Sequence, residues 1–500
     1  VRSAKPLIIP AGALTGTGCC QSRTIARFIT PCFGLCVADL SQTSSDLDMT
    51  PTERRASASL GGIFALRMLG LFMIIPVFSV AGQSYQYATP VLIGLAVGVY
   101  GLSQAILQIP MGWLSDRWGR HQVMLLGLTL FAVGSVVSAL ADSVYMVTFG
   151  RVLQGMGAIS GAVMALASDL TREEQRPKVM AVIGMTIGLS FTIAMVAGPA
   201  IAAASGLSGI FWCTALMAIT GLLLVWKVVP VAVSKAPASE TLATKGQIAA
   251  LFRHPELLRL NFGVLVLHLL LTAIFVVLPT LLLQQDFVSE QHWQLYLPVL
   301  VGAFILMVPL MILASRKQQE KGYLLLAISL LIVSFVLILI NQQLWSIALA
   351  LLLFFVGFNY LEASMPALLS RIAPAGLKGT AMGTYASAQF FGAFAGGILG
   401  GAVASFSSGE SLFAVAALIG LLWLAYASSM TVPARSQRLS LPVKVADEAA
   451  AAQLAERLTQ LKGVLEVTVV VAEQRLYLKV GQQHFDLAEA QSLVESSQKS

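Results

Sequence analysis

The sequence reads Gly112-Trp113-Leu114-Ser115-Asp116-Arg117-Trp118-Gly119-Arg120-His121 between two long apolar runs. Gly112 and Gly119 permit a tight turn and a close approach of neighbouring helices. Asp116 stands beside Arg117 and close to Arg120, so the segment can form ion pairs at adjacent helix ends. Taken alone, the segment indicates a basic turn between two helices, and the flanking sequence decides which class of protein carries it.

Composition identifies a membrane protein. Of 500 residues, 57% are hydrophobic and 11% are charged, whereas an ordinary soluble domain carries about 25% charged residues. Apolar stretches separated by short polar loops run from Ser57 to Met430, a length that holds roughly a dozen helices of about 20 residues each. The net charge of +7 does not indicate a nucleic-acid partner, because the basic residues gather in alternate loops.

Those alternate loops fix the predicted topology. Lys and Arg occur after the second, fourth, sixth, eighth and tenth predicted helices and are missing from the loops between them, so the positive-inside rule places both termini in the cytoplasm. We therefore expect an all-α membrane protein with twelve transmembrane helices, at 57–81, 90–111, 122–140, 145–168, 178–203, 209–229, 257–283, 293–314, 322–341, 345–370, 379–404 and 412–431.

The chain divides into five predicted regions. Residues 1–48 are either a disordered extension or a mis-assigned start, since the first Met is Met49. Two six-helix halves, 49–231 and 257–432, flank a cytoplasmic linker, 232–256, that contains a candidate surface helix. Two similar halves are typical of transporters that rock one half against the other around a midplane site.

Ionisable residues inside apolar spans are expensive and mark functional sites. Four occur here, Arg67, Arg151, His268 and Glu362, one in every third predicted helix. Glu362 is the acid buried within a span, and we predict that it carries a proton, because a desolvated carboxyl favours protonation until a cation approaches. Its alternative role is an ion pair that holds the halves together. Arg67 and Arg151 keep their protons, and His268 is either a relay or a neutral hydrogen-bonding group.

Further polar side chains lie in the same helices and are candidates for lining a substrate cavity. They are Gln104, Gln108, Gln154, Asn261, Asn359 and Gln389.

In its setting between the second and third of twelve helices, the segment from Gly112 to His121 resembles the signature loop of the major facilitator superfamily, Gly-x-Leu-x-Asp-Arg-x-Gly-Arg-Arg/Lys, and departs from it only at His121. The stretch from Gly150 to Ala158 is similar to the helix 4 motif of the same superfamily, which implies a part for Arg151 in proton coupling. In helix 5, Gly198 and Pro199 match an antiporter motif whose three other glycines are alanine here.

The resemblance implies a cytoplasmic latch between the halves. Asp116 is expected to face the start of helix 11, at Lys378-Gly379-Thr380, and Arg120 is expected to pair with Asp169 at the end of helix 4. The corresponding loop after helix 8, from Ser315 to Lys321, lacks the glycines and the acid of the motif, which predicts a one-sided latch.

Residues 433–500 are predicted to form a separate cytoplasmic domain. Strands at 439–445, 464–472 and 476–480 and helices at 447–462 and 486–495 give the order βαββα, which resembles a ferredoxin-like α+β domain. Without a Cys-x-x-Cys, the domain is not expected to carry metal. A tail of this kind on a facilitator of the drug and proton antiporter type resembles the YajR group of bacterial transporters.

We expect a secondary transporter of the bacterial inner membrane, working by alternating access, that exports an amphipathic or drug-like small molecule in exchange for protons. A facilitator or proton symporter for a small polar or anionic nutrient and a receptor that signals through the tail are the alternatives. The sequence lacks a Walker-type phosphate loop and a metal-binding cluster, so we predict no enzyme activity, cofactor or metal. The expected partners are the lipid bilayer, the substrate and protons, with an unknown ligand for the tail and no nucleic acid.

Overall fold

The computed structural model describes residues 49–172, 175–230, 253–373, 378–406, 410–431, 436–443, 448–470, 475–481, 489–490 and 492–494. The extension 1–48 and the candidate surface helix of the linker lie outside these residues. The first described helix begins with a capping box, because the Thr50 backbone N–H donates to Glu53 Oε2 at 2.8 Å and the Glu53 N–H donates to Thr50 Oγ1 at 3.2 Å.

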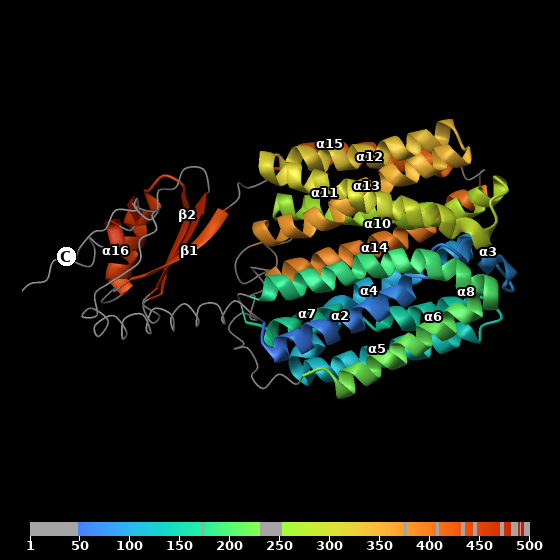
Figure 1. Ribbon diagram of the computed structural model, residues 1–500, viewed down its shortest axis with the longest axis horizontal. Helices are drawn as coiled ribbons and strands as arrows, with labels where there is room; N and C mark the ends of the chain where they lie inside the picture. Colours follow the sequence, from blue (N-terminus) through green and yellow to red (C-terminus); the bar gives the residue numbers. More distant parts are fainter. Residues whose placement is uncertain are drawn as a thin grey trace, which may run out of the picture. The chain divides into compact units, whose positions relative to one another are not determined.

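Long helices make up the described chain before the tail (Figure 1). They are α2 Pro51–Phe72, α3 Phe78–Ala81, the 3₁₀ helix η1 Gly82–Ser84, α4 Pro90–Trp118, α5 Arg120–Ala139, α6 Val144–Met156, α7 Ser160–Asp169, α8 Arg176–Lys227, α10 Pro255–Gln284, the 3₁₀ helix η3 Ser289–Gln291, α11 His292–Lys317, α12 Glu320–Ile340, α13 Leu344–Ile372, α14 Lys378–Phe406 and α15 Glu410–Ser428.

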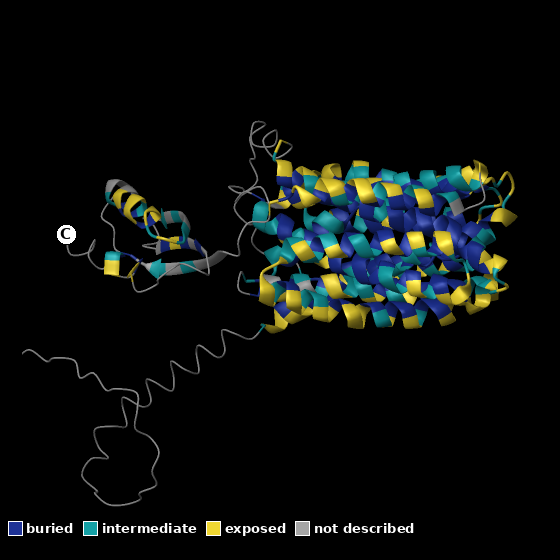
Figure 2. Ribbon diagram, turned by 90° about the horizontal axis from the view of Figure 1, so that it is seen from above, coloured by how far each residue is buried: buried dark blue, intermediate teal, exposed yellow. Residues whose placement is uncertain are grey.

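Ten helices of the described chain are long and apolar enough to cross a membrane. One of them, α8, joins two helical segments across a kink at Gly206, where φ is 66° and ψ is −170°. This backbone region is nearly restricted to glycine. Large apolar side chains such as Trp226 and Ile340 are 72% and 78% exposed. Exposed residues lie on the outside of the helical region, where lipid would cover them (Figure 2).

Helix α14 packs between α4 of the N-terminal half (α2 to α8) and α10 of the C-terminal half (α10 to α15) (Figure 1). Glycines make both contacts close. A Cβ at Gly397 would lie 2.4 Å from Gly94 O on α4, and a Cβ at Gly396 would lie 2.2 Å from Leu269 O on α10. Small residues of this kind let membrane helices approach until their backbones touch.

The contact between α4 and α14 covers only one part of the two helices. It includes Gly94 and Gly397 and extends to the bond from Ser387 Oγ to Ala105 O at 3.1 Å. Further along, a Cβ at Gly112 on α4 or at Gly383 on α14 would meet nothing within 4 Å. The close approaches of α4 and α14 thus lie toward residues 82–89, which together with residues 285–291 are called the predicted outer end. Gly112 and Gly383, nearer the opposite, predicted inner end, leave room for a side chain.

The tail contains a three-stranded antiparallel sheet of order β1-β3-β2, built from β1 Ser436–Pro442, β2 Val464–Val470 and β3 Arg475–Gly481. Helix α16, Glu448–Thr459, follows β1 and packs Leu454 and Leu458 on one face of this sheet, against Leu476 and Leu478. Residues 489–490 and 492–494 are helical. The described tail thus has its own hydrophobic core.

Candidate functional site

In the N-terminal half, Arg67 on α2 is buried in a polar network. Its Nη2 donates to Tyr100 OH at 2.9 Å and to Gln104 Oε1 at 2.6 Å, both on α4. The Gln104 amide donates in turn to Ser160 Oγ at 3.3 Å and to Gln108 Oε1 at 3.5 Å. Two other donors of Arg67, Nε and Nη1, are buried without a hydrogen-bond partner among the described residues.

Arg151 on α6 lies on the other side of Tyr100, with its guanidinium carbon 4.9 Å from the centre of that ring. It donates to the backbone carbonyls of Ala96 and Val97 at 3.3 Å each and to Gln154 Oε1 at 2.9 Å. The Gln154 amide donates to Ser135 Oγ at 2.8 Å. These partners of the second arginine also belong to the N-terminal half.

The C-terminal half holds a separate group of three side chains from three helices. The Gln389 amide nitrogen, on α14, lies 2.8 Å from His268 Nε2 on α10 and 3.1 Å from Glu362 Oε1 on α13. The other carboxylate oxygen, Glu362 Oε2, lies 3.8 Å from His268 Nε2. Tyr385 stands one turn before Gln389 on α14, and its buried hydroxyl has no hydrogen-bond partner among the described residues.

The hydrogen bonds indicate which form of His268 is present. Its Nδ1 lies 3.2 Å from Val264 O, and a carbonyl oxygen only accepts, so Nδ1 carries a hydrogen. Its Nε2 faces the amide nitrogen of Gln389, which only donates, so Nε2 is the acceptor. These contacts fit the tautomer that carries its hydrogen on Nδ1, with the Gln389 amide shared between the ring and the carboxylate of Glu362.

Exposure separates the two groups. The side chain of Glu362 is 34% exposed, whereas Arg67 is 1% exposed and Arg151 is 2% exposed. The four ionisable side chains predicted from the sequence thus lie in two groups, one per half. Only the C-terminal group presents a charged side chain to accessible space.

Aromatic rings connect the C-terminal group to the other half. The His268 ring lies 5.7 Å from Phe358, and Phe358 lies 6.2 Å from Phe355 on the same helix, α13. Phe355 lies 5.8 Å from Phe191 on α8, which contacts Phe72 of α2 at 5.1 Å. Phe191 and Met195 belong to a buried cluster whose other buried members come from the C-terminal half. These rings join the halves across their interface.

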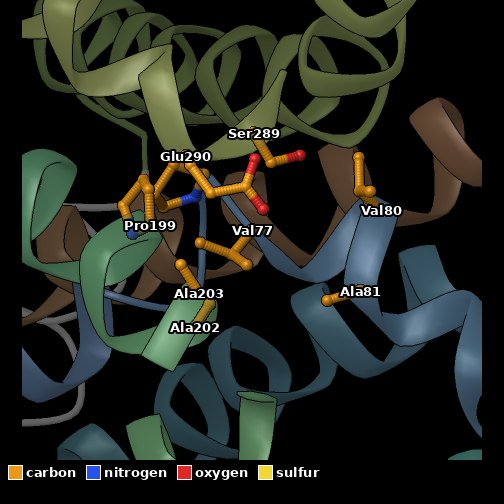
Figure 3. A pocket seen from close by; sticks show the side chains of 9 residues that line it. Val77, Val80, Ala81, Pro199, Ala202, Ala203, Ser289 and Glu290 are labelled. Carbon is orange, nitrogen blue, oxygen red and sulfur yellow. The ribbon is translucent and has the colours of Figure 1, made fainter. Parts of the chain in front are cut away.

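A hollow of about 190 Å³ lies at the predicted outer end, between the halves (Figure 3). The carboxylate of Glu290 stands at its edge above an apolar wall that includes Val77, Ala202 and Ala203. The remaining lining residues are Pro76, Val80, Ala81, Pro199 and Ser289. Gly198, the residue before Pro199, packs against the turn that follows α2, since a Cβ there would lie 2.3 Å from Met73 O.

In the signature loop, the described polar contacts stay within the N-terminal half. Arg120 forms an ion pair with Asp116, donates from Nη1 to Ser115 Oγ at 2.7 Å and places Nε 3.3 Å from Asp169 Oδ2. The Arg117 guanidinium lies 4.0 Å from the ring centre of Trp113. Gly119 ends α4 with φ of 107°, a conformation that favours glycine. No hydrogen bond or ion pair between Asp116 and the start of α14 is found among the described residues, and the Lys378 side chain lies outside them.

The C-terminal half has an ion pair of its own at the equivalent place, which sequence comparison of the loops missed. Arg371 at the end of α13 pairs with Glu320 at the start of α12, with Nη1 3.3 Å from Oε1 and a second bond from Nη2 to Oε2. The acid and the base have exchanged helices relative to Arg120 and Asp169. The sequence signal that could have revealed this pair is an acid at the start of α12 together with a base at the end of α13.

Some predicted cavity residues stay apart from both groups. Asn261 on α10 has a buried Oδ1 with no hydrogen-bond partner among the described residues, and Asn359 on α13 makes no described hydrogen bond to the C-terminal group. Tyr100 and Ser135, which complete the arginine network, were missed by the sequence. Within the described chain, no group of three or more His, Cys, Asp or Glu side chains could hold a metal ion.

The sequence matches a known family of membrane proteins. The family model described as Major Facilitator Superfamily matches residues 60–396 and 262–465. The chain belongs to the major facilitator superfamily. It is therefore a multi-pass membrane transporter of that type.

Two relatives cover most of the chain. Inner membrane transport protein YajR of Escherichia coli (strain K12) is 43% identical over 439 residues, which are 87% of this chain and 96% of that protein. An uncharacterized transporter of Buchnera aphidicola subsp. Acyrthosiphon pisum (strain APS) is 35% identical over 346 residues, 69% of this chain and 89% of that protein.

Solved structures share the fold at low identity. A bacterial homolog of the human lysosomal transporter Spinster, in an inward-facing and occupied conformation, gives a TM-score of 0.63 at 12% identity and covers 76% of this chain and 97% of its own. The human organic anion transporter MFSD10 gives 0.58 at 21% identity and covers 76% of this chain and 100% of its own.

Proposed function

We propose that this facilitator is a proton-coupled secondary transporter of the bacterial inner membrane that exports an amphipathic or drug-like small molecule. The observation that carries the proposal is the C-terminal group: Glu362, whose side chain is 34% exposed, lies within 3.8 Å of a histidine and shares the amide of Gln389 with it. An ionisable group inside a membrane span that reaches accessible space is a natural place for a proton to exchange against cargo.

The hydrogen bonds suggest how a proton is held there. Glu362 Oε2 has no hydrogen-bond partner among the described residues, and His268 Nε2 lies 3.8 Å away. A proton that arrives on Nε2 displaces the amide hydrogen of Gln389 and creates an ion pair with the carboxylate. A proton on the carboxylate removes its charge instead. Either step changes the electrostatic field that a charged cargo meets at Glu362.

We further propose that the chain crosses the membrane twelve times, with both termini in the cytoplasm. The kink at Gly206 divides α8 into two segments, and α2, which is not among the ten long apolar helices, lies where the first crossing is predicted. The basic residues of alternate loops support this orientation.

In this orientation the described conformation is open toward the cytoplasm. The rings of Phe191 and Phe355 and the glycine contact between α4 and α14 would close the outer side, while open space around Gly112 and Gly383 marks the inner side. Arg120 would then keep Asp116 within its own half until the cytoplasmic side closes. Closure would bring Asp116 toward the positive N-terminal end of α14 and complete the latch.

A second cargo class, a small organic anion, is favoured by one observation. Arg67 keeps two buried donors without a partner among the described residues, and the hydrogen bonds that Arg67 and Arg151 make to described residues include none to a carboxylate. A rearrangement that exposes this side of the N-terminal half would offer those donors to an anion.

For the tail we propose a ferredoxin-like fold. The order β1-β3-β2 with antiparallel pairs and α16 between β1 and β2 supports it.

The coupling is tested with purified protein in liposomes that contain a pH-sensitive dye. A panel of lipophilic cations and a panel of organic anions are added outside in turn. The proposal predicts that at least one cation moves protons in the opposite direction to its own flux. Cargo flux without proton movement would contradict coupling, and proton movement with anions alone would favour the second cargo class.

A further inference from the structure

Two polar atoms of the C-terminal group are buried without a hydrogen-bond partner among the described residues. One is Glu362 Oε2, which only accepts when the carboxylate is ionised, and the other is the hydroxyl of Tyr385, which can donate. A buried polar atom without a partner is uncommon in native proteins and needs a specific explanation, such as a functional role. One hydrogen bond between these two atoms would satisfy both.

The two atoms belong to the same region of α14 and α13. Tyr385 and Gln389 stand four residues apart on α14, so they share one face of the helix and lie about 6 Å apart along its axis. Gln389 is bonded to Glu362 Oε1 at 3.1 Å. Tyr385 is 3% exposed, and the charge of Glu362 acts on its hydroxyl. The hydroxyl thus lies one helical turn from the present partner of the carboxylate.

The structure leaves the two side chains free to approach each other. Pro366 stands four residues after Glu362 on α13 and has no N–H to donate to the Glu362 carbonyl, so the helix lacks one hydrogen bond and can bend at this level. On α14, a Cβ at Gly383 would meet nothing within 4 Å, so close packing does not hold that side of the helix. A small bend of α13 relative to α14 would bring the hydroxyl of Tyr385 to Glu362 Oε2.

Two ionisable groups of the described helices around α13 face Glu362. Helix α10 brings His268, whose Nε2 lies 3.8 Å from Glu362 Oε2, and α14 brings Tyr385. Glu256 and Arg259 of α10 pair with each other. The ionisable side chains of α11 and α12, which also pack against α13, lie within the first or last five residues of those helices. A change of charge on the carboxylate is therefore felt first by His268 and Tyr385.

We propose that Tyr385 is a positioning residue that donates a hydrogen bond to Glu362 Oε2 once the carboxyl group has lost its proton. This inference rests on the proposed function, in which Glu362 exchanges a proton. The proton leaves the carboxyl group for water, and Tyr385 keeps its own hydrogen throughout. Because a hydrogen bond to the charged form favours that form, Tyr385 lowers the proton affinity of Glu362.

The test follows the protonation of Glu362 itself, in the full chain purified and reconstituted in lipid. Infrared difference spectra recorded in steps of pH report the C=O stretch of a protonated carboxyl group, and the band of Glu362 is the one that Glu362→Gln lacks. Tyr385→Phe removes only the hydroxyl. In this variant the midpoint of the Glu362 band should move to higher pH by about one unit, which is about tenfold in proton affinity.

Tyr296→Phe on α11 is the matched control. The hydroxyl of Tyr296 is also buried without a hydrogen-bond partner among the described residues. Its ring lies 5.9 Å from that of His292, the first residue of α11, close to the predicted outer end. Each variant loses one buried hydroxyl and keeps the ring, so both should fold. Tyr296→Phe should leave the midpoint of the Glu362 band unchanged.

A second measurement needs no substitution of Tyr385. In the unsubstituted protein, the infrared bands of a tyrosine side chain should change at the pH at which the Glu362 band disappears, because the hydroxyl then gains an ionised acceptor. In Glu362→Gln this tyrosine change should be missing. A tyrosine change that persists in Glu362→Gln would contradict the proposed hydrogen bond.

The outcomes separate this inference from the proposed function. An unshifted midpoint in Tyr385→Phe, or an equal shift in the two tyrosine variants, would overturn the inference even if the dye assay shows coupled flux. A shift confined to Tyr385→Phe without coupled flux would support the hydrogen bond and overturn the proposed function alone. Spectra without any band that depends on Glu362 would overturn both.

Discussion

The close contact between α4 and α14 predicts that one methyl group at Gly397 shifts the balance between conformations. A Cβ there would lie 2.4 Å from Gly94 O and 3.0 Å from Gly98 Cα, whereas a carbon normally stays about 3.3 Å or more from a carbonyl oxygen. The helices would have to separate by nearly 1 Å at this point. Overpacking of this kind costs about 1 to 3 kcal/mol.

The cost falls on the state in which the predicted outer end is closed. A change of about 1 to 3 kcal/mol lowers the population of that state relative to the alternative by about 5-fold to 150-fold. Spin labels at Gln83 and Gln284, both exposed and one in each half, report the separation by pulsed electron resonance. In Gly397→Ala a longer distance should appear or grow.

Gly383→Ala is the matched control on the same helix, because a Cβ at Gly383 meets nothing within 4 Å in this state. It should not lower the population of the short distance. If the folded Gly397→Ala protein showed the same distance distribution as the unsubstituted protein, or if both variants shifted it equally, the contact would not set the conformational balance.

Two further substitutions test local features of the fold. Gly206→Ala forces a side chain into φ of 66° and ψ of −170° and should cost about 1 to 3 kcal/mol, seen as a lower thermal unfolding midpoint in detergent; an unchanged midpoint would contradict the strained kink. Leu478→Ala empties a buried site of the tail core and should cost the tail about 2 to 5 kcal/mol. Proteolysis should then remove the tail while the helical region stays intact, and simultaneous loss of both would show that the tail is not independent.

The charged residues of the candidate site were predictable because an ionisable side chain stands out in an apolar span. Which of these residues lie together in space was not predictable from the sequence. Arg67 and Arg151 share Tyr100 through a hydrogen bond and a ring contact, whereas His268 meets Glu362 through Gln389. Which helix faces meet depends on packing between helices far apart in the sequence, and an amide or hydroxyl in a helix carries little signal of its own.

The fold was predictable to the level of long apolar helices followed by a small α/β tail. The expectation of a one-sided latch came from comparing loop motifs residue by residue. That comparison overlooked the pair formed by Glu320 and Arg371, because the acid and the base have exchanged helices relative to Arg120 and Asp169. An ion pair can form whichever of the two helices carries the acid, whereas a motif requires each residue type at a fixed position.

Proton exchange at Glu362 is tested most directly by comparing two fluxes of one cargo in proteoliposomes. For a cation identified by the dye assay, Glu362→Gln should abolish uptake driven by a pH gradient and retain exchange of labelled against unlabelled cargo, because an amide cannot release a proton. Glu290→Gln, at the edge of the outer hollow, should keep both fluxes. Gradient-driven uptake by Glu362→Gln at the unsubstituted rate would contradict the assignment of this carboxylate as the proton carrier.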